Sequence, residues 1–157
     1  MATLRTIALT FCCLLLTSQA TADEPDPIVV VVSPGLRVEN ISLSTLRRLF
    51  MAERLRSETG ERLVPFNQPV NSRLRREFER RTLGMSPDEV GRHWVDQRIR
   101  GDRGAPRTVP TPALALQVIV ALPGGITYVR QSQATSAVKV LKVDGKAPGD
   151  PGYPLGP

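Results

Sequence analysis

Four residues with binding chemistry, Asn71, Ser72, Arg73 and Arg75, lie together where a helix is expected to begin. The first backbone N–H groups of a helix have no partner within the helix, and the helix dipole places positive charge there. A serine hydroxyl and arginine side chains add donors and charge, so this pattern can bind an inorganic anion such as phosphate or sulfate. The same residues also fit an ordinary helix start, with Ser72 as the N-cap and the arginines in solvent.

The sequence contains few residues of the types that catalyse reactions or bind metal ions. His93 is the only histidine, and the only cysteines, Cys12 and Cys13, lie in an N-terminal apolar segment. Catalytic zinc sites usually have three protein ligands. The sequence also contains no Gly-x-Ser-x-Gly motif, P-loop or dinucleotide-binding fingerprint. We therefore expect a protein that is not an enzyme and that uses no metal ion or other cofactor.

Residues 1–22 have the features of a cleavable export signal. Arg5 supplies the positive charge, residues 7–16 form a short apolar core, and Ala20-Thr21-Ala22 is a small-residue cleavage pattern. The alternative, a membrane anchor, is disfavoured because the apolar core is well short of the ~20 residues that span a bilayer. We expect a periplasmic or secreted protein that begins at Asp23 and has no membrane span after cleavage.

Arginine dominates the charge of the chain. Of the 21 basic residues, 15 are arginines between Arg47 and Arg107. Such a field can attract nucleic acid, anionic lipid or a small anion, but interleaved acids such as Glu77 and Glu79 could equally pair with the arginines on the surface. Export argues against nucleic acid. The expected partners are therefore an inorganic anion or an envelope protein that meets the arginine-rich face with acidic groups.

The first elements of the mature chain follow from apolar spacing and caps. Residues 28–32 are a continuous apolar run, typical of a strand that is covered on both faces, as in a parallel sheet. Ser42 or Ser44 can cap the next helix, whose apolar side chains share one face. Residues 62–66 predict a strand that should end near Pro65 unless it lies at a sheet edge.

The Ser72 helix should turn Leu74 and Phe78 inward. Its arginines should point largely outward; these are Arg73, Arg75, Arg76 and Arg80. A capping box at Ser86-Pro87-Asp88-Glu89 starts another helix, in which Val90 and Trp94 are expected to be core residues.

The last helix begins at Thr111-Pro112 and is apolar nearly all round over residues 114–122, which predicts that it is well buried.

Strands are expected at residues 126–129 and 138–143. Strands that alternate with helices favour an α/β fold, a three-layer sandwich with a mostly parallel sheet, over residues 23–143. Residues 144–157 form a Pro/Gly-rich tail that we expect to be extended and mobile.

The order of these segments over residues 28–143 resembles one lobe of the phosphate-type periplasmic solute-binding proteins, which serve ABC transporters. The resemblance is carried by the helix end Phe50-Met51-Ala52, the helix start at Ser72 and the strand Gly125-Ile126-Thr127-Tyr128. It implies the fold of a type II periplasmic binding protein lobe, in a short relative made of that lobe alone.

In this family the lobe binds phosphate with a Ser-Gly-Thr helix start and an arginine four residues before the serine. Ser72 matches the serine, whereas Arg73, Leu74 and Gln68 occupy the other three positions. The resemblance implies a non-enzymatic domain with weak phosphate or anion binding, linked to ABC-type phosphate uptake. The alternative is an interaction or scaffold protein of the periplasm that keeps the lobe without binding a ligand.

Overall fold

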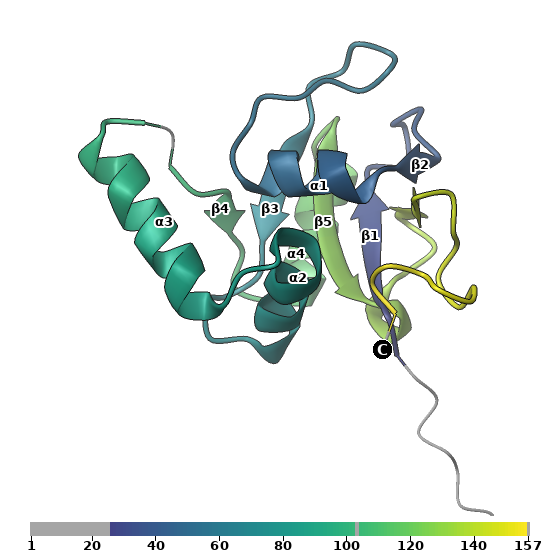
Figure 1. The fold of residues 1–157 in the computed structure, drawn as a ribbon. Coiled ribbons are helices and arrows are strands. Elements are labelled where there is room, and N and C mark those ends of the chain that lie inside the picture. The colour runs from purple at the N-terminus through teal and green to yellow at the C-terminus, as the bar shows by residue number, and fades with distance from the viewer. Residues whose placement is uncertain (1–25, 103, 157) are drawn as a thin grey trace, which may run out of the picture.

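The protein is represented by a computed structural model, which describes residues 26–102 and 104–156. The expected export signal at residues 1–22 lies outside the described residues. Helices cover both faces of a five-stranded sheet, so the predicted three-layer α/β sandwich is confirmed (Figure 1). Among the helices of the described part, none is both long and apolar enough to cross a membrane.

The main sheet has the strand order β4-β3-β5-β1-β6. β3 runs parallel to both β4 and β5, whereas β1 runs antiparallel to both β5 and β6. Four strands therefore point in one direction and β1 alone opposes them, which confirms a mostly parallel sheet. The strands are β1 (Ile28–Val32), β3 (Val64–Asn67), β4 (Arg107–Thr108), β5 (Gly125–Arg130) and β6 (Lys139–Val140).

The five residues of β1 are fully buried because their side chains alternate between two cores. Ile28, Val30 and Val32 belong to the core beneath α1 (Leu43–Phe50) and α2 (Arg73–Leu83). Val29 and Val31 belong to the core beneath α4 (Pro112–Ala121) on the other face. The expectation of a strand covered on both faces is confirmed, although β1 is the strand that runs against the others.

The predicted serine caps form at three helix starts. The hydroxyl oxygen of Ser42 accepts a hydrogen bond from the Thr45 N–H at 3.0 Å, and Ser72 caps α2 in the same way. Ser86 starts α3 (Pro87–Ile99) with a complete capping box. These caps depend on residues only three positions apart, so they follow directly from the local sequence.

The prediction that the second strand ends near Pro65 is wrong. β3 contains Pro65 and lies inside the sheet, between β4 and β5. The Val64 N–H bonds to the Gly124 carbonyl of the turn before β5, so Pro65 faces the β4 side, where β4 pairs only with Phe66 and Asn67. Proline is tolerated because no strand of the described residues pairs with β3 on that side at this position.

The expected strand at residues 138–143 is divided. β6 pairs with β1, and β7 (Lys142–Val143) pairs with β2 (Asn40–Ile41) in a separate two-stranded sheet. Leu141 lies buried between the two strands, and its N–H bonds to the Val30 carbonyl. The chain changes sheets at this residue.

The expectation of an extended tail is wrong for residues 144–156. These residues form turns that fold back on the domain, and the Ile28 N–H bonds to the Leu155 carbonyl at 3.1 Å. Tyr153 and Leu155 are buried in the core beneath α1 and α2. The Gly and Pro residues serve as turn formers here, and the two apolar side chains anchor the segment.

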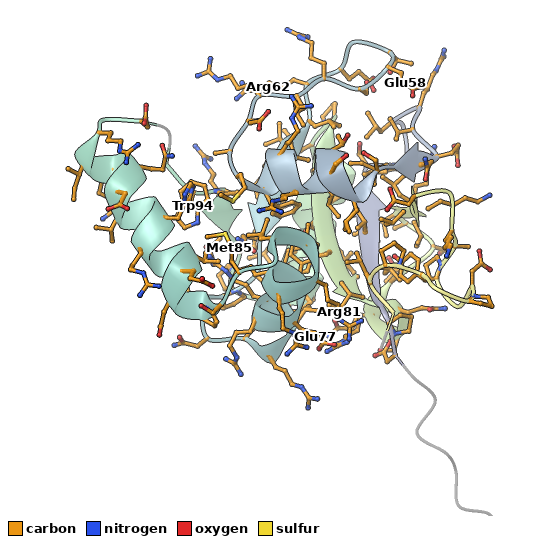
Figure 2. The ribbon with its side chains drawn as sticks, in the orientation of Figure 1. Glu58, Arg62, Glu77, Arg81, Met85 and Trp94 are labelled. Atoms are coloured by element: carbon orange, nitrogen blue, oxygen red, sulfur yellow. The ribbon has the colours of Figure 1, made fainter. Side chains whose placement is uncertain are left out.

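Two helices are less buried than predicted. Trp94 is half-buried at the margin of the core (Figure 2). Val90 is the only buried residue of α3, all of whose residues are described. On α4, Ala115, Leu116 and Ile119 are buried, whereas Leu114 and Val120 are 41% and 45% exposed. α4 packs on the sheet with one face only, because no further layer of the described chain covers its outer face.

Candidate functional site

The start of α2 lies just beyond the carboxyl end of β3, and ligands of open α/β sheets bind at the carboxyl ends of parallel strands. β3 ends at Asn67, and α2 begins at Arg73 after its cap Ser72. Asn71 and Arg73 are exposed and Ser72 is half-buried. Three of the four predicted site residues therefore gather at one solvent-facing helix start.

Ser72 works first as a helix cap. Its hydroxyl oxygen accepts the Arg75 N–H at 3.2 Å, and its backbone N–H bonds to the Pro69 carbonyl at 2.9 Å. The Asn71 carbonyl is also occupied, because the Arg76 guanidinium donates to it at 2.7 Å. In these two residues, the hydroxyl hydrogen of Ser72 and the side chain of Asn71 are left for a ligand to contact.

The prediction that Arg75 points outward is wrong, because its side chain is buried beneath α2. Its side chain is 6% exposed and donates to the Glu79 carboxylate at 2.6 Å and to the Gln68 carbonyl at 3.1 Å. Positions 75, 78, 79 and 82 share the buried face of α2. A buried guanidinium needs a counter-charge, and Glu79 supplies it one turn along the same helix.

A buried polar network that the sequence did not predict lies beneath α2. The Tyr128 hydroxyl is hydrogen-bonded to the Asn67 side chain, and the Gln68 amide donates to the Tyr128 carbonyl at 3.0 Å. The Tyr128 ring stacks on Phe78 with ring centres 3.6 Å apart. Burial raises the pKa of Tyr128, so its hydroxyl remains protonated at neutral pH. The adjacent polar residues Asn67 and Gln68, at the end of an apolar strand, are the signal that could have indicated it.

A second group of charges lies at the same end of the sheet. Glu77 on α2 lies beside Arg81 (Figure 2) and accepts a hydrogen bond from it at 2.8 Å. Glu77 also accepts a hydrogen bond from Arg130 at the end of β5. Burial by itself would raise the pKa of Glu77, but the hydrogen bond and charge of Arg130 outweigh burial and hold that pKa below its ordinary value. Arg130 also donates to the Asp26 carbonyl at 3.0 Å. Arg81 and Arg130 therefore stabilise the fold through these contacts.

The charge that remains for a ligand at the α2 start is small. Arg73 is exposed and hydrogen-bonds to no carboxylate of the described residues, although its charge contributes to the lowered pKa of Glu77. The first backbone N–H groups of the helix and the Ser72 hydroxyl complete the set of donors. This arrangement can hold an anion that stays in contact with water.

The fold matches that of phosphate-binding receptors of ABC transporters. An ABC-type phosphate transport receptor from Vibrio cholerae aligns with 83% of this chain and 53% of its own, at 14% identity and a TM-score of 0.65. PstS from Borrelia burgdorferi aligns with 83% of this chain and 54% of its own, at 13% identity and a TM-score of 0.63. A protein from Clostridium perfringens, assigned to the phosphate ABC transporter substrate-binding proteins and solved with bound phosphate, aligns with 78% of this chain, at 14% identity and a TM-score of 0.63.

The chain spans about half the length of these receptors, since it covers 46% to 54% of each. It therefore has the fold of a substrate-binding protein lobe, as the segment order predicted. No protein-family model matches the sequence, and no curated protein matches it. At these identities the similarity establishes the fold.

Proposed function

We propose that the chain is an exported, non-enzymatic solute-binding domain that binds a small inorganic anion, phosphate or sulfate, at the start of α2. The binding groups are Asn71, Ser72, Arg73 and the first N–H groups of the helix. One observation carries the proposal: the helix start lies at the carboxyl end of β3, in a fold shared with phosphate-binding receptors. Its cellular role would be in ABC-type phosphate uptake, in the periplasm or outside the cell.

Binding at this site should be weak. One lobe contacts the anion from one side only, and water on the other side screens the charges. We expect a Kd in the high-micromolar to millimolar range, which corresponds to about 4 to 6 kcal/mol. Affinity should fall as salt is added, because the interaction is mainly electrostatic and exposed to solvent.

Calorimetric titration with phosphate and with sulfate tests the proposal. Ser72→Asn keeps an N-cap acceptor but removes the hydroxyl, and Arg73→Gln removes the charge, so each should weaken binding. Arg80→Gln is the matched control, because Arg80 is an exposed arginine on the same helix. No binding heat up to tens of millimolar phosphate or sulfate, with the protein folded, would contradict the proposal.

Export has its own test. The sequence pattern at residues 20–22 favours a mature N-terminus at Asp23. N-terminal sequencing of the protein recovered from periplasm or medium should begin there. Recovery of the protein in the membrane fraction with Met1 retained would contradict export by cleavage.

A second candidate function is a protein-interaction module of the envelope. The specific observation is a groove of about 690 Å³ between α4 and residues 133–137, lined with uncharged residues that include Leu116, Val120 and Ala137. A photo-crosslinking amino acid at position 120, compared with one at the exposed Arg92 on α3, tests it in the producing cell. An envelope protein captured at position 120 alone supports this candidate, and the absence of any adduct contradicts it.

A further inference from the structure

A second cationic site lies at the opposite end of the sheet from the α2 start. A cavity of about 270 Å³ opens where β3 and β4 begin, between residues 62–65 and residues 104–107. Figure 2 shows Arg62 at this end of the molecule, far from Glu77 and Arg81. Three arginines line the cavity: Arg54, Arg62 and Arg107.

The three guanidinium groups lack carboxylate partners. Among residues 26–102 and 104–156, none of them forms an ion pair or a side-chain hydrogen bond. Glu53 is the one acid among the described residues that line the cavity, and the Arg48 guanidinium already binds it at 2.7 Å. The cavity is therefore lined by three positive charges that no carboxylate of the described residues pairs with.

The backbone that carries Arg54 is held by a tight helix end. The Ala52 N–H bonds to the Leu49 carbonyl and the Glu53 N–H to the Arg48 carbonyl, both at 3.1 Å. This Schellman pattern requires a left-handed residue, and Ala52 adopts a φ of 64° where glycine is usual. Arg54 follows two residues later, so this turn sets the direction in which the backbone presents Arg54.

The backbones of the other two arginines are also fixed. The Arg62 carbonyl packs so closely on Gly124 that a Cβ there would lie 2.1 Å from it, and the next residue, Leu63, donates its N–H to Leu55 at 3.0 Å. Arg107 opens β4 and pairs with Phe66 of β3. The backbone positions of all three arginines are therefore defined before a ligand arrives, which lowers the entropic cost of binding.

The short length of β4 creates the cavity. β4 begins only at Arg107, so no strand pairs with Val64 and Pro65 on that side of β3, and both residues line the opening. The volume is slightly below the range of about 300 to 1,000 Å³ that holds drug-sized ligands. It suits a small, compact anion.

We propose that Arg54, Arg62 and Arg107 form a binding site for a small anion that carries two or more phosphate or carboxylate groups. Guanidinium groups bind both kinds of group through paired hydrogen bonds. Three uncompensated cations favour a ligand with several negative charges over a single chloride or acetate. This site is separate from the α2 start, and its occupancy does not depend on the proposed phosphate site.

Calorimetric titration with pyrophosphate and with citrate, at constant ionic strength, tests the site. We expect a loss of affinity of about three- to tenfold, as for the loss of one solvent-exposed charged hydrogen bond, for whichever ligand binds more tightly. The variants are Arg54→Gln, Arg62→Gln and Arg107→Gln, each tested alone. Arg80→Gln removes the same charge from α2 and should change affinity by less than about twofold.

Two results would overturn the proposal. One is a triple variant, R54Q/R62Q/R107Q, that is folded by circular dichroism and binds both ligands as tightly as the original chain. The other is an equal loss in Arg80→Gln, which would mean that the anions respond to the overall charge. Preference for pyrophosphate identifies phosphate groups as the ligand chemistry, and preference for citrate identifies carboxylates.

Discussion

The two ends of the central sheet use the same residue type in different ways. At the carboxyl end of β3 and β5, Arg75 is bound by Glu79, and Arg130 is bound by Glu77. At the amino end, the three arginines of the cavity, Arg54, Arg62 and Arg107, have no carboxylate partner among the described residues. The difference follows from burial. A buried guanidinium must be paired, whereas an exposed one can remain hydrated until a ligand replaces the water.

This comparison changes how an arginine-rich sequence is interpreted. The helix start at Ser72 has the better motif, yet one of its two predicted arginines, Arg75, supports the fold. The amino end has no motif, because its arginines come from the loop after α1, the approach to β3 and the start of β4. Charge therefore locates a ligand site only after the partners of each charge are known.

The largest expected effect comes from breaking the buried pair at the carboxyl end. Glu79→Ala leaves the Arg75 guanidinium buried and without its counter-charge, which should cost about 3 to 5 kcal/mol in the free energy of unfolding. Glu53→Ala breaks the exposed pair with Arg48 at the amino end and should cost less than about 1 kcal/mol. Urea denaturation measures both.

A double variant separates the lost charge pair from the lost packing. Arg75→Met with Glu79→Leu replaces both charges with apolar groups and should recover most of the stability lost in Glu79→Ala. Equal losses in Glu79→Ala and Glu53→Ala would mean that burial does not distinguish the two ends.

Substitution of Glu77 should have an intermediate effect on the free energy of unfolding, and this effect should depend on pH. Burial alone would raise the pKa of Glu77, but Arg130 and Arg81 lower it below its ordinary value of 4.5. A carboxyl whose pKa is lowered by folding stabilises the protein above its ordinary pKa, and that stability is lost as the pH falls below it. Glu77→Gln should cost about 1 to 2 kcal/mol at pH 7 and less at pH 3. An equal cost at both pH values would contradict the ion-pair role.

The sequence predicted those features that depend on neighbouring residues. The caps at Ser42, Ser72 and Ser86 join side chains and backbone groups three positions apart, and all three form. The fold class followed from the alternation of strands and helices. The Ser72 helix start was located correctly for the same reason.

Features that depend on distant packing were predicted less well. Arg75 is buried because its helix lies over the end of β3, and Pro65 is tolerated because β4 is short. Trp94 is half-buried because only one edge of α3 reaches the core. No local pattern contains this information. The cavity at the amino end was missed because it brings together three segments that are separate in sequence.

Tyr153 tests whether an uncharged polar group also needs a hydrogen-bond partner when it is buried. Its hydroxyl is buried and has no hydrogen-bond partner among the described residues, so Tyr153→Phe should leave stability unchanged or increase it by up to about 1 kcal/mol. Burial raises the pKa of Tyr153 to about 12 from its ordinary value of 10.0. A raised pKa means that stability is lost as the pH rises from about 10 to 12, and the phenylalanine variant should lose less. Destabilisation by more than 1 kcal/mol at pH 7 would show that the hydroxyl has a partner.

The smallest expected effect concerns Ala52. It tests whether the strained turn at this residue orients Arg54 at the amino end of the sheet. Ala52 and Gly84 both adopt left-handed backbones after a helix, with φ of 64° and 66°. Ala52→Gly relieves about 1 kcal/mol of strain but adds freedom to the unfolded chain, so the net gain should be about 0.5 kcal/mol or less. Gly84→Ala is the reverse change after α2 and should cost a similar small amount. If the turn at Ala52 directs Arg54 toward the cavity, Ala52→Gly should weaken pyrophosphate binding slightly despite its greater stability, whereas Gly84→Ala should not. Tighter pyrophosphate binding in Ala52→Gly would show that the strained turn does not orient Arg54.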